Sequence, residues 1–177
     1  MSQAEIAGGQ LTPAAELPRK GHRLRDFSLP STSGDIVHLS DYRGRANLVL
    51  IVQEANDKAE RLISDAAARY SEIKRLEAEV VLILHSELDR PAVYRRERNL
   101  PYPVVTDATG DTCRALGGVD VNGNQAWAVY VTDRFGEVFA IFREIEGAAL
   151  PDIAEVLKWL EFIEAQCPEC EAPEWPL

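Results

Sequence analysis

The sequence predicts one α/β domain with a central mixed β-sheet flanked by helices. Two nearly unbroken apolar runs, 46–52 (ANLVLIV) and 79–85 (EVVLILH), have the length of strands that are covered on both faces. Between them apolar residues recur at helical spacing, namely Ala59, Leu62, Ile63, Ala66, Ala67, Tyr70, Ile73 and Leu76. A strand, a helix and a strand in this order predict a right-handed parallel crossover.

The residues before this unit predict an N-terminal β-hairpin. Two short strand-like pieces flank the turn signal Ser33-Gly34-Asp35. Ser40 follows as the expected cap of one helical turn that ends at Gly44. The hairpin therefore leads directly into the first buried strand.

The residues after the crossover add further strands and short helices. Pro91 begins a short basic helix that runs to Arg98, and 101–110 holds a short strand and a turn. The segment 111–118 (DTCRALGG) is a brief helix that glycine ends. The segment 127–144 alternates apolar and polar residues around a turn, which predicts a second hairpin.

The last helix has an unusually wide apolar face. Pro151 is its expected start, and its inward positions are Ile153, Val156, Leu157, Leu160 and Ile163. Trp159 and Phe162 lie beside this stripe and broaden it. We expect the extra width to be covered by the C-terminal tail or by a second subunit, and we predict a homodimer.

The composition limits the possible partners. The 177 residues fit a single domain, with an arm at 1–20, a folded part at 21–165 and a tail at 166–177. Asp and Glu number 29 against 19 Lys and Arg, a net charge of −10. This charge repels nucleic-acid phosphates and anionic lipid, so we expect neither as a partner.

The distribution of apolar residues predicts a cytoplasmic location. No run approaches the roughly 20 apolar residues of a membrane span, and the first residues lack the apolar stretch of a secretion signal. In a reducing compartment, a Cys-x-x-Cys pattern indicates redox or metal chemistry before a structural disulfide.

Three segments together resemble the alkyl hydroperoxide reductase and thiol-specific antioxidant family, the peroxiredoxins of the thioredoxin-like superfamily. They read DFSLPSTSGDIVHLSDYRGRANLVLIV, then EVVLILHSELDRPAVYRRERNLPYPVVTDATGDTCRALGG, then AVYVTDRFGEVF. Their order and spacing span residues 26–139. The resemblance implies a thioredoxin-like fold and an antioxidant, oxidoreductase type of function.

The resemblance does not extend to the family's reactive residue. In that family a Thr-x-x-Cys motif follows the first buried strand, at a helix start where the helix dipole favours thiolate. Here the stretch reads VQEANDKAERLIS, without cysteine, threonine or proline, and the expected position falls near Arg61. The thioredoxin branch would place a cis-proline where Ala126 and Trp127 stand. No family catalytic residue transfers to a matching position.

Other side chains offer weaker candidates. Cys113, alone on its short helix, is expected to be a small buried apolar group. Three arginines either bind an anion at the family's pocket or form a solvated basic face: Arg61, Arg95 and Arg96. Three histidines lack metal-ligand spacing and are expected to be structural or exposed: His22, His38 and His85.

The tail pair Cys167 and Cys170 is the candidate redox site. The pair sits beyond a helix C-terminus among Glu164, Glu169, Glu171 and Glu174, which should raise the thiol pKa values. Three interpretations remain open: a dithiol that exchanges with a partner disulfide, a zinc site of four thiolates across a symmetric dimer, and incidental packing. The redox interpretation is favoured because the fold is a redox fold.

These interpretations lead to three possible functions. The first is a thiol-dependent oxidoreductase without the usual peroxidatic cysteine and without a cofactor. The second is a non-catalytic binding or regulatory module on a redox fold. The third is a dimer that zinc holds together through Cys167 and Cys170.

Overall fold

The structure is a computed structural model that describes residues 16–54, 58–86, 90–120 and 122–166. Its central sheet has the spatial order β5-β4-β3-β6-β7, and a separate hairpin pairs β1 with β2. β3, β4 and β5 run parallel, whereas β6 and β7 are antiparallel to their neighbours. The strands are β1 Ser28–Pro30, β2 Ile36–His38, β3 Asn47–Glu54, β4 Ala78–His85, β5 Val104–Asp107, β6 Ala128–Thr132 and β7 Val138–Arg143.

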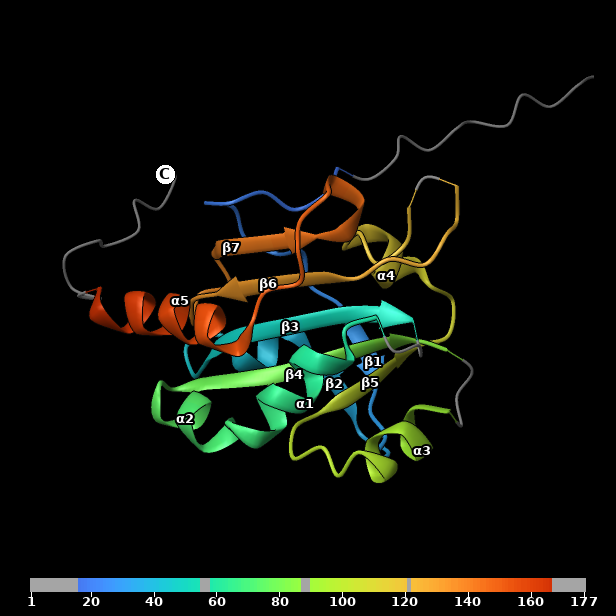
Figure 1. Cartoon of the computed structure of the whole chain (residues 1–177), viewed down its shortest axis with the longest axis horizontal. Helices are drawn as coiled ribbons and strands as arrows, with labels where there is room; N and C mark the ends of the chain where they lie inside the picture. The colour runs from blue at the N-terminus through green and yellow to red at the C-terminus, as the bar shows by residue number, and fades with distance from the viewer. Residues whose placement is uncertain (1–15, 55–57, 87–89, 121, 167–177) are drawn as a thin grey trace, which may run out of the picture.

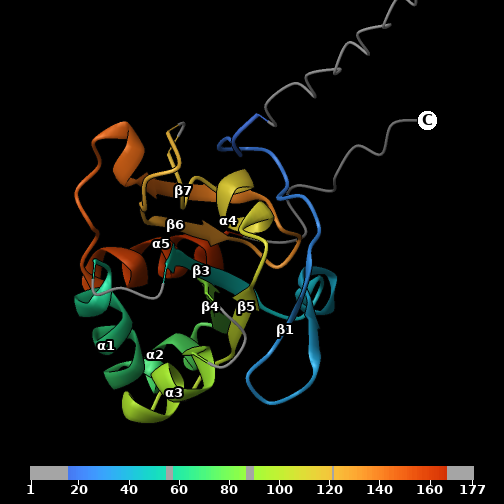
Figure 2. The same cartoon turned by 90° about the vertical axis from the view of Figure 1, so that its right-hand side faces the viewer.

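The sheet is covered on both faces. α1 and α2 connect β3 to β4, α3 connects β4 to β5, and α5 closes the chain (Figure 1). Figure 2 shows α1, α2 and α5 on one side of the sheet and β1 on the other. The helical elements are η1 Leu39–Tyr42, α1 Glu60–Ala68, α2 Tyr70–Arg75, α3 Arg90–Glu97, α4 Asp111–Ala115, η2 Glu144–Glu146 and α5 Ile153–Ala165.

The central strand β3 explains why its sequence is apolar without alternation. Seven of its eight residues are buried, because one face meets α1, α2 and α5 and the other meets the N-terminal segment and α4. Val49 and Ile51 belong to the first core, and Leu48, Leu50 and Val52 belong to the second. The prediction of a mixed sheet with covered faces and an N-terminal hairpin is confirmed.

Three local expectations were wrong in detail. The helix expected between β3 and β4 is divided at Arg69, where ψ is 19°, and beyond the break Tyr70 donates a hydrogen bond to Glu79 on β4. Ser40 does not cap η1, because His38 occupies that position and the Asp41 carboxylate accepts its N–H. α5 begins at Ile153, capped by Asp152, because the Asp152 carboxylate accepts the N–H of Glu155.

The outer face of α5 carries the aromatic surface that the sequence predicted. All five inward positions are buried, whereas the Phe162 side chain is 53% exposed. Its ring makes edge contacts with Phe139 on β7 and with Trp159, and Lys20 lies 5.0 Å from the centre of the Trp159 ring. Within the described part of the chain, no helix has the length and apolar character needed to cross a membrane.

Candidate functional site

The end of β3 and the start of α1 are held together by a hydrogen-bonded network. Gln53, completely buried at the end of β3, accepts the backbone N–H of Ala59 at 3.0 Å and donates to the Tyr94 hydroxyl at 3.4 Å. Tyr94 donates in turn to the Glu60 carboxylate at 2.8 Å, and Arg98 donates to the same carboxylate at 2.8 Å. Gln53 thereby satisfies one of the free N–H groups at the beginning of α1.

Charges within this network are paired. The Arg98 guanidinium lies 3.7 Å from the centre of the Tyr94 ring, a cation–π contact. Burial, and next the hydrogen bond to Glu60, raise the pKa of Tyr94 well above its ordinary value, so the phenol stays protonated and donates. Glu60 in the first turn also complements the helix dipole. The polar groups at this end of α1 therefore support each other.

The expected family position falls at this end of α1. Arg61, near which the resemblance leads us to expect the family's cysteine, is exposed on the first turn. The stretch 53–65 contains no cysteine in the sequence. The neighbouring Lys58 bonds to the Gln125 carbonyl at 2.7 Å and to the Glu144 carboxylate at 3.1 Å, which ties this region to the approach to β6. The stretch around the start of α1 therefore offers no thiol.

Cys113 lies on α4 and is completely buried. Its backbone N–H donates to Asp107 at 2.8 Å, and Asp107 also accepts the N–H of Gly110 at 3.0 Å. Burial, and after it the Asp107 charge, raise the pKa of the Cys113 thiol far above its ordinary value. The thiol is protonated and enclosed at neutral pH, and the prediction of a buried group is confirmed.

The three histidines lie in separate parts of the structure. His85 packs against Gly110, where an added Cβ would lie 2.8 Å from Nε2 of the ring. His38 Nδ1 lies 2.6 Å from the Ser28 hydroxyl across the hairpin, and His22 is exposed on the N-terminal segment. Among the described residues, no three His, Cys, Asp or Glu side chains gather as a metal site would require.

Two of the three candidate arginines share a hollow. Arg95 and Arg96 line a space of about 350 Å³ beside α3, and Arg95 donates to the Ser33 hydroxyl at 3.1 Å and to the Leu100 carbonyl at 3.4 Å. Arg61 belongs to another helix and does not line this hollow. The expected group of three is therefore not brought together, because α1 and α3 present their arginines to different surfaces.

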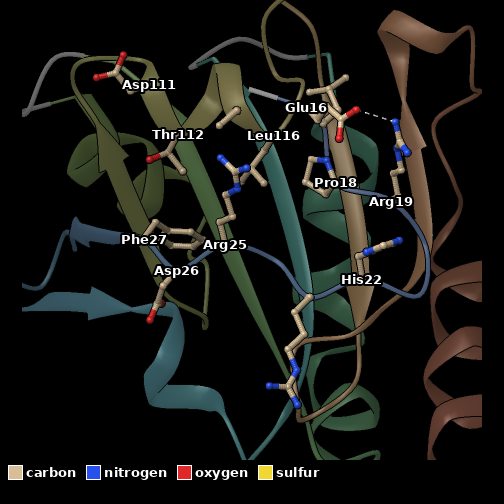
Figure 3. A pocket seen from close by; sticks show the side chains of 13 residues that line it. Glu16, Pro18, Arg19, His22, Arg25, Asp26, Phe27, Asp111, Thr112 and Leu116 are labelled. Carbon is tan, nitrogen blue, oxygen red and sulfur yellow. Dashed lines mark hydrogen bonds and ion pairs between the residues drawn. The ribbon is translucent and has the colours of Figure 1, made fainter. Parts of the chain in front are cut away.

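A second cavity was not anticipated from the sequence. It measures about 410 Å³ and lies between the N-terminal segment and α4. Figure 3 shows Arg25 extending into it near Phe27 and Leu116. The available signal was the basic run His22 to Arg25 before the hairpin, which local pattern alone assigns to a strand. Only the fold shows that α4 forms the opposite wall.

The tail cysteines Cys167 and Cys170 lie outside the described residues. The nearest described acidic group, Glu164, accepts hydrogen bonds from Asn47 at 2.6 Å and from Arg134 at 3.0 Å. The Glu164 carboxylate is thus already paired with residues of the folded domain. The expected effect of the tail glutamates on the thiols depends on Glu169, Glu171 and Glu174.

The strand order, the parallel crossover and the two covering layers define a thioredoxin-like fold of the peroxiredoxin type. The model of the AhpC/TSA family matches residues 20–141, and the chain belongs to this family. No curated protein matches the chain.

Three solved structures with the same fold are distant from this chain in sequence. Peroxidoxin BcpB from Mycobacterium tuberculosis is 21% identical with a TM-score of 0.70, over 81% of this chain and 97% of that one. The bacterioferritin comigratory protein of Xanthomonas campestris is 16% identical with a TM-score of 0.64, over 78% and 92%. The mitochondrial 2-Cys peroxiredoxin of Plasmodium falciparum is 15% identical with a TM-score of 0.68, over 82% and 94%.

Proposed function

We propose that this protein is a thiol-dependent oxidoreductase of the AhpC/TSA family whose reactive groups are Cys167 and Cys170. The observation that carries the proposal is that the other two places where a reactive thiol could lie, the start of α1 and Cys113, do not offer one. The start of α1, where the sequence resemblance leads us to expect the family's reactive cysteine, holds a paired network, and Cys113 is enclosed. Family membership supports thiol chemistry, and the tail pair supplies the remaining thiols.

The proposed reaction is thiol–disulfide exchange with a partner protein. The thiolate of one tail cysteine attacks a sulfur of the partner disulfide, forms a mixed disulfide and releases a partner thiolate. The second tail cysteine attacks its neighbour in that bond, which closes the Cys167–Cys170 disulfide and releases the second partner thiolate. The tail loses two electrons and two protons, and the partner disulfide is reduced to a dithiol.

The experiment is stepwise oxidation of the full chain followed by thiol mapping. Oxidised glutathione at rising pH should close the tail pair faster at higher pH, because the nearby glutamates favour protonated thiols. Mass spectrometry after alkylation should find Cys167 and Cys170 joined and reversible by reductant. Cys113→Ala is the matched control and should oxidise like the parent, since Cys113 is buried.

The same experiment separates the competing interpretations of the tail. About half an equivalent of zinc per chain, with alkylation only after chelation, would support the dimeric four-thiolate site. Ready alkylation without disulfide formation would leave the tail as packing. Either outcome overturns the redox proposal.

A second candidate function is a non-catalytic binding or regulatory module. The paired network of Gln53, Tyr94, Glu60 and Arg98 favours it, because these groups stabilise the start of α1 without any reactive atom. This function predicts that Cys167→Ser together with Cys170→Ser leaves partner binding intact. The redox function predicts that the same double substitution abolishes exchange.

We further propose a cytoplasmic homodimer that uses the outer face of α5. The 53% exposure of Phe162 and its contacts with Trp159 and Phe139 support this interface. Light scattering should show twice the chain mass for the parent and for Phe135→Ser, whose side chain is 45% exposed elsewhere. Phe162→Ser should weaken association. A parent monomer at high concentration would end the dimer proposal.

A further inference from the structure

The cavity between the N-terminal segment and α4 has the size and walls of a small-molecule site. Its volume of about 410 Å³ lies within the roughly 300–1,000 Å³ of typical ligand pockets. One wall is the chain from Glu16 to Phe27, and the other is formed by α4 and the residue after it. These walls are far apart in the sequence and meet only through the second core.

The cavity offers an apolar surface. Pro18 and Phe27 contribute from the N-terminal segment, and Ala115 and Leu116 contribute from the end of α4. Leu116 is buried and Phe27 is half-buried, and both pack in the second core with their positions fixed by it. The walls can therefore contact the apolar part of a ligand without a large rearrangement.

The acidic side chains of the cavity are already paired. Glu16 bonds to Arg19 at 3.0 Å, and Asp111 bonds to Arg114 at 3.0 Å. The third carboxylate, Asp26, accepts the backbone N–H of Ser40 at 3.0 Å and lies 3.7 Å from the Arg43 guanidinium. None of the three carboxylates therefore forms an ion pair with Arg23 or Arg25.

Two arginines of the cavity remain uncompensated. Within the described ranges 16–54, 58–86, 90–120 and 122–166, neither Arg23 nor Arg25 forms an ion pair or a side-chain hydrogen bond. Figure 3 shows the Arg25 side chain inside the hollow, with Thr112 and Leu116 on the facing wall. His22 lines the same space. The lining holds three carboxylates and three arginines, but Arg43 and Arg114 from outside the lining pair with two of the carboxylates. The positive charges of Arg23 and Arg25 are therefore left over, and they favour an anion.

We propose that this cavity binds a small amphipathic anion, with its carboxylate on Arg25 and its apolar part against Phe27 and Leu116. A guanidinium pairs with a carboxylate through two parallel hydrogen bonds, so Arg25 supplies both charge and orientation. Burial of an alkyl chain or a ring against the apolar walls then adds to the binding free energy. This site is separate from the tail cysteines, and it stands whether or not they react.

The test is titration calorimetry of the full chain with octanoate and with 1-octanol. Octanoate should bind, 1-octanol should bind at least about tenfold more weakly, and Arg25→Gln should reduce octanoate affinity by about tenfold, the scale of one charge-assisted contact. Arg95→Gln changes an arginine of the other hollow and should leave octanoate affinity unchanged. Raised salt should weaken octanoate binding.

Three results would overturn the proposal. Equal affinity for octanoate and 1-octanol would show an apolar hollow without anion recognition. Equal losses in Arg25→Gln and Arg95→Gln would show a general charge effect. Absence of octanoate binding at millimolar concentration would show that the cavity does not take this class of ligand. The comparison of the two probes on the parent chain needs no variant, so it does not depend on how any variant folds.

Discussion

The start of α1 and the cavity beside α4 hold their charged side chains in opposite states. At α1, Glu60 is bonded to both Tyr94 and Arg98, and the buried Gln53 completes the network. At the cavity, Arg25 extends into open space and has no ion-pair partner among the described residues. The first arrangement stabilises the fold, whereas the second leaves a charge available to a ligand.

Burial explains why the two regions differ. Gln53 is fully buried, so its polar atoms must find partners inside the protein. Arg25 is exposed to water, so its charge is solvated and costs little when it is left unpaired. The start of α1 is thus held by a hydrogen-bonded network, whereas the hollow beside α4 leaves an arginine without an ion-pair partner among the described residues. Three stability measurements test this contrast, and a fourth tests the enclosed thiol of Cys113.

The largest effect is expected from Gln53→Ala. The substitution leaves the Ala59 N–H without its acceptor and opens a small cavity, so we expect a loss of about 2–4 kcal/mol in the free energy of unfolding. Urea unfolding followed by circular dichroism gives the value. Arg61→Ala, which changes an exposed residue of α1, is the control and should change stability by less than about 0.5 kcal/mol. Similar values for the two variants would mean that the network does not support α1.

Glu60→Ala should have an intermediate effect. It removes the acceptor shared by Tyr94 and Arg98, whose side chains are partly buried, and we expect a loss of about 1–2 kcal/mol. Glu97→Ala is the control, because the Glu97 side chain is 64% exposed and lies 4.0 Å from the same arginine. A loss in Glu97→Ala as large as that in Glu60→Ala would contradict the assignment of the network to Glu60.

The alkaline pH dependence should show the enclosed thiol of Cys113. In the unfolded chain this thiol ionises near about pH 8.5, whereas burial and then Asp107 raise its pKa in the folded protein. Above that pH the unfolded chain releases the proton and the folded protein keeps it. Stability contributed by the thiol is therefore lost as pH rises, by up to about 1.4 kcal/mol per pH unit.

Urea unfolding in reductant at about pH 8, 9 and 10 measures this slope. Between about pH 9 and 10, Cys113→Ala should lose about 1 kcal/mol less than the parent. The tyrosines ionise in the same range, but they contribute equally to both chains and cancel in the comparison. Cys167→Ser, at a cysteine of the tail, is the comparison variant. Parallel curves for the parent and Cys113→Ala would show that the Cys113 thiol ionises in the folded protein.

The smallest effect is expected from Arg25→Ala. Since Arg25 is exposed and unpaired among the described residues, its removal should change the free energy of unfolding by less than about 0.5 kcal/mol. The same urea experiment provides the measurement, with Glu60→Ala as the contrasting variant. A loss above about 1 kcal/mol would mean that Arg25 has a structural partner, and the contrast between the two regions would then fail.

The sequence was sufficient for the fold because its signals were periodic and local. The continuous apolar runs of β3 and β4 and the inward stripe of α5 predicted their burial correctly. The break at Arg69 and the cap at Asp152 depend on single backbone positions, and periodicity does not report them. Helix type is readable from spacing, whereas helix ends depend on individual hydrogen bonds.

The candidate sites were harder to predict because they join distant residues. Gln53, Tyr94 and Glu60 are unremarkable in the sequence, and their network exists only because α3 folds against the start of α1. The Arg25 cavity likewise needs α4 as its second wall. The absence of a cysteine at 53–65, in contrast, was visible directly, since it depends on residue type alone.

Peroxide consumption coupled to a thioredoxin-type reductant tests most directly the claim that the start of α1 offers no reactive thiol. The parent chain and the double variant Cys167→Ser with Cys170→Ser are compared, with an ordinary peroxiredoxin as the positive control. We predict that neither chain consumes peroxide at a peroxiredoxin's rate, because no thiolate lies at the start of α1. Turnover at an ordinary peroxiredoxin rate that survives the double substitution would contradict the account.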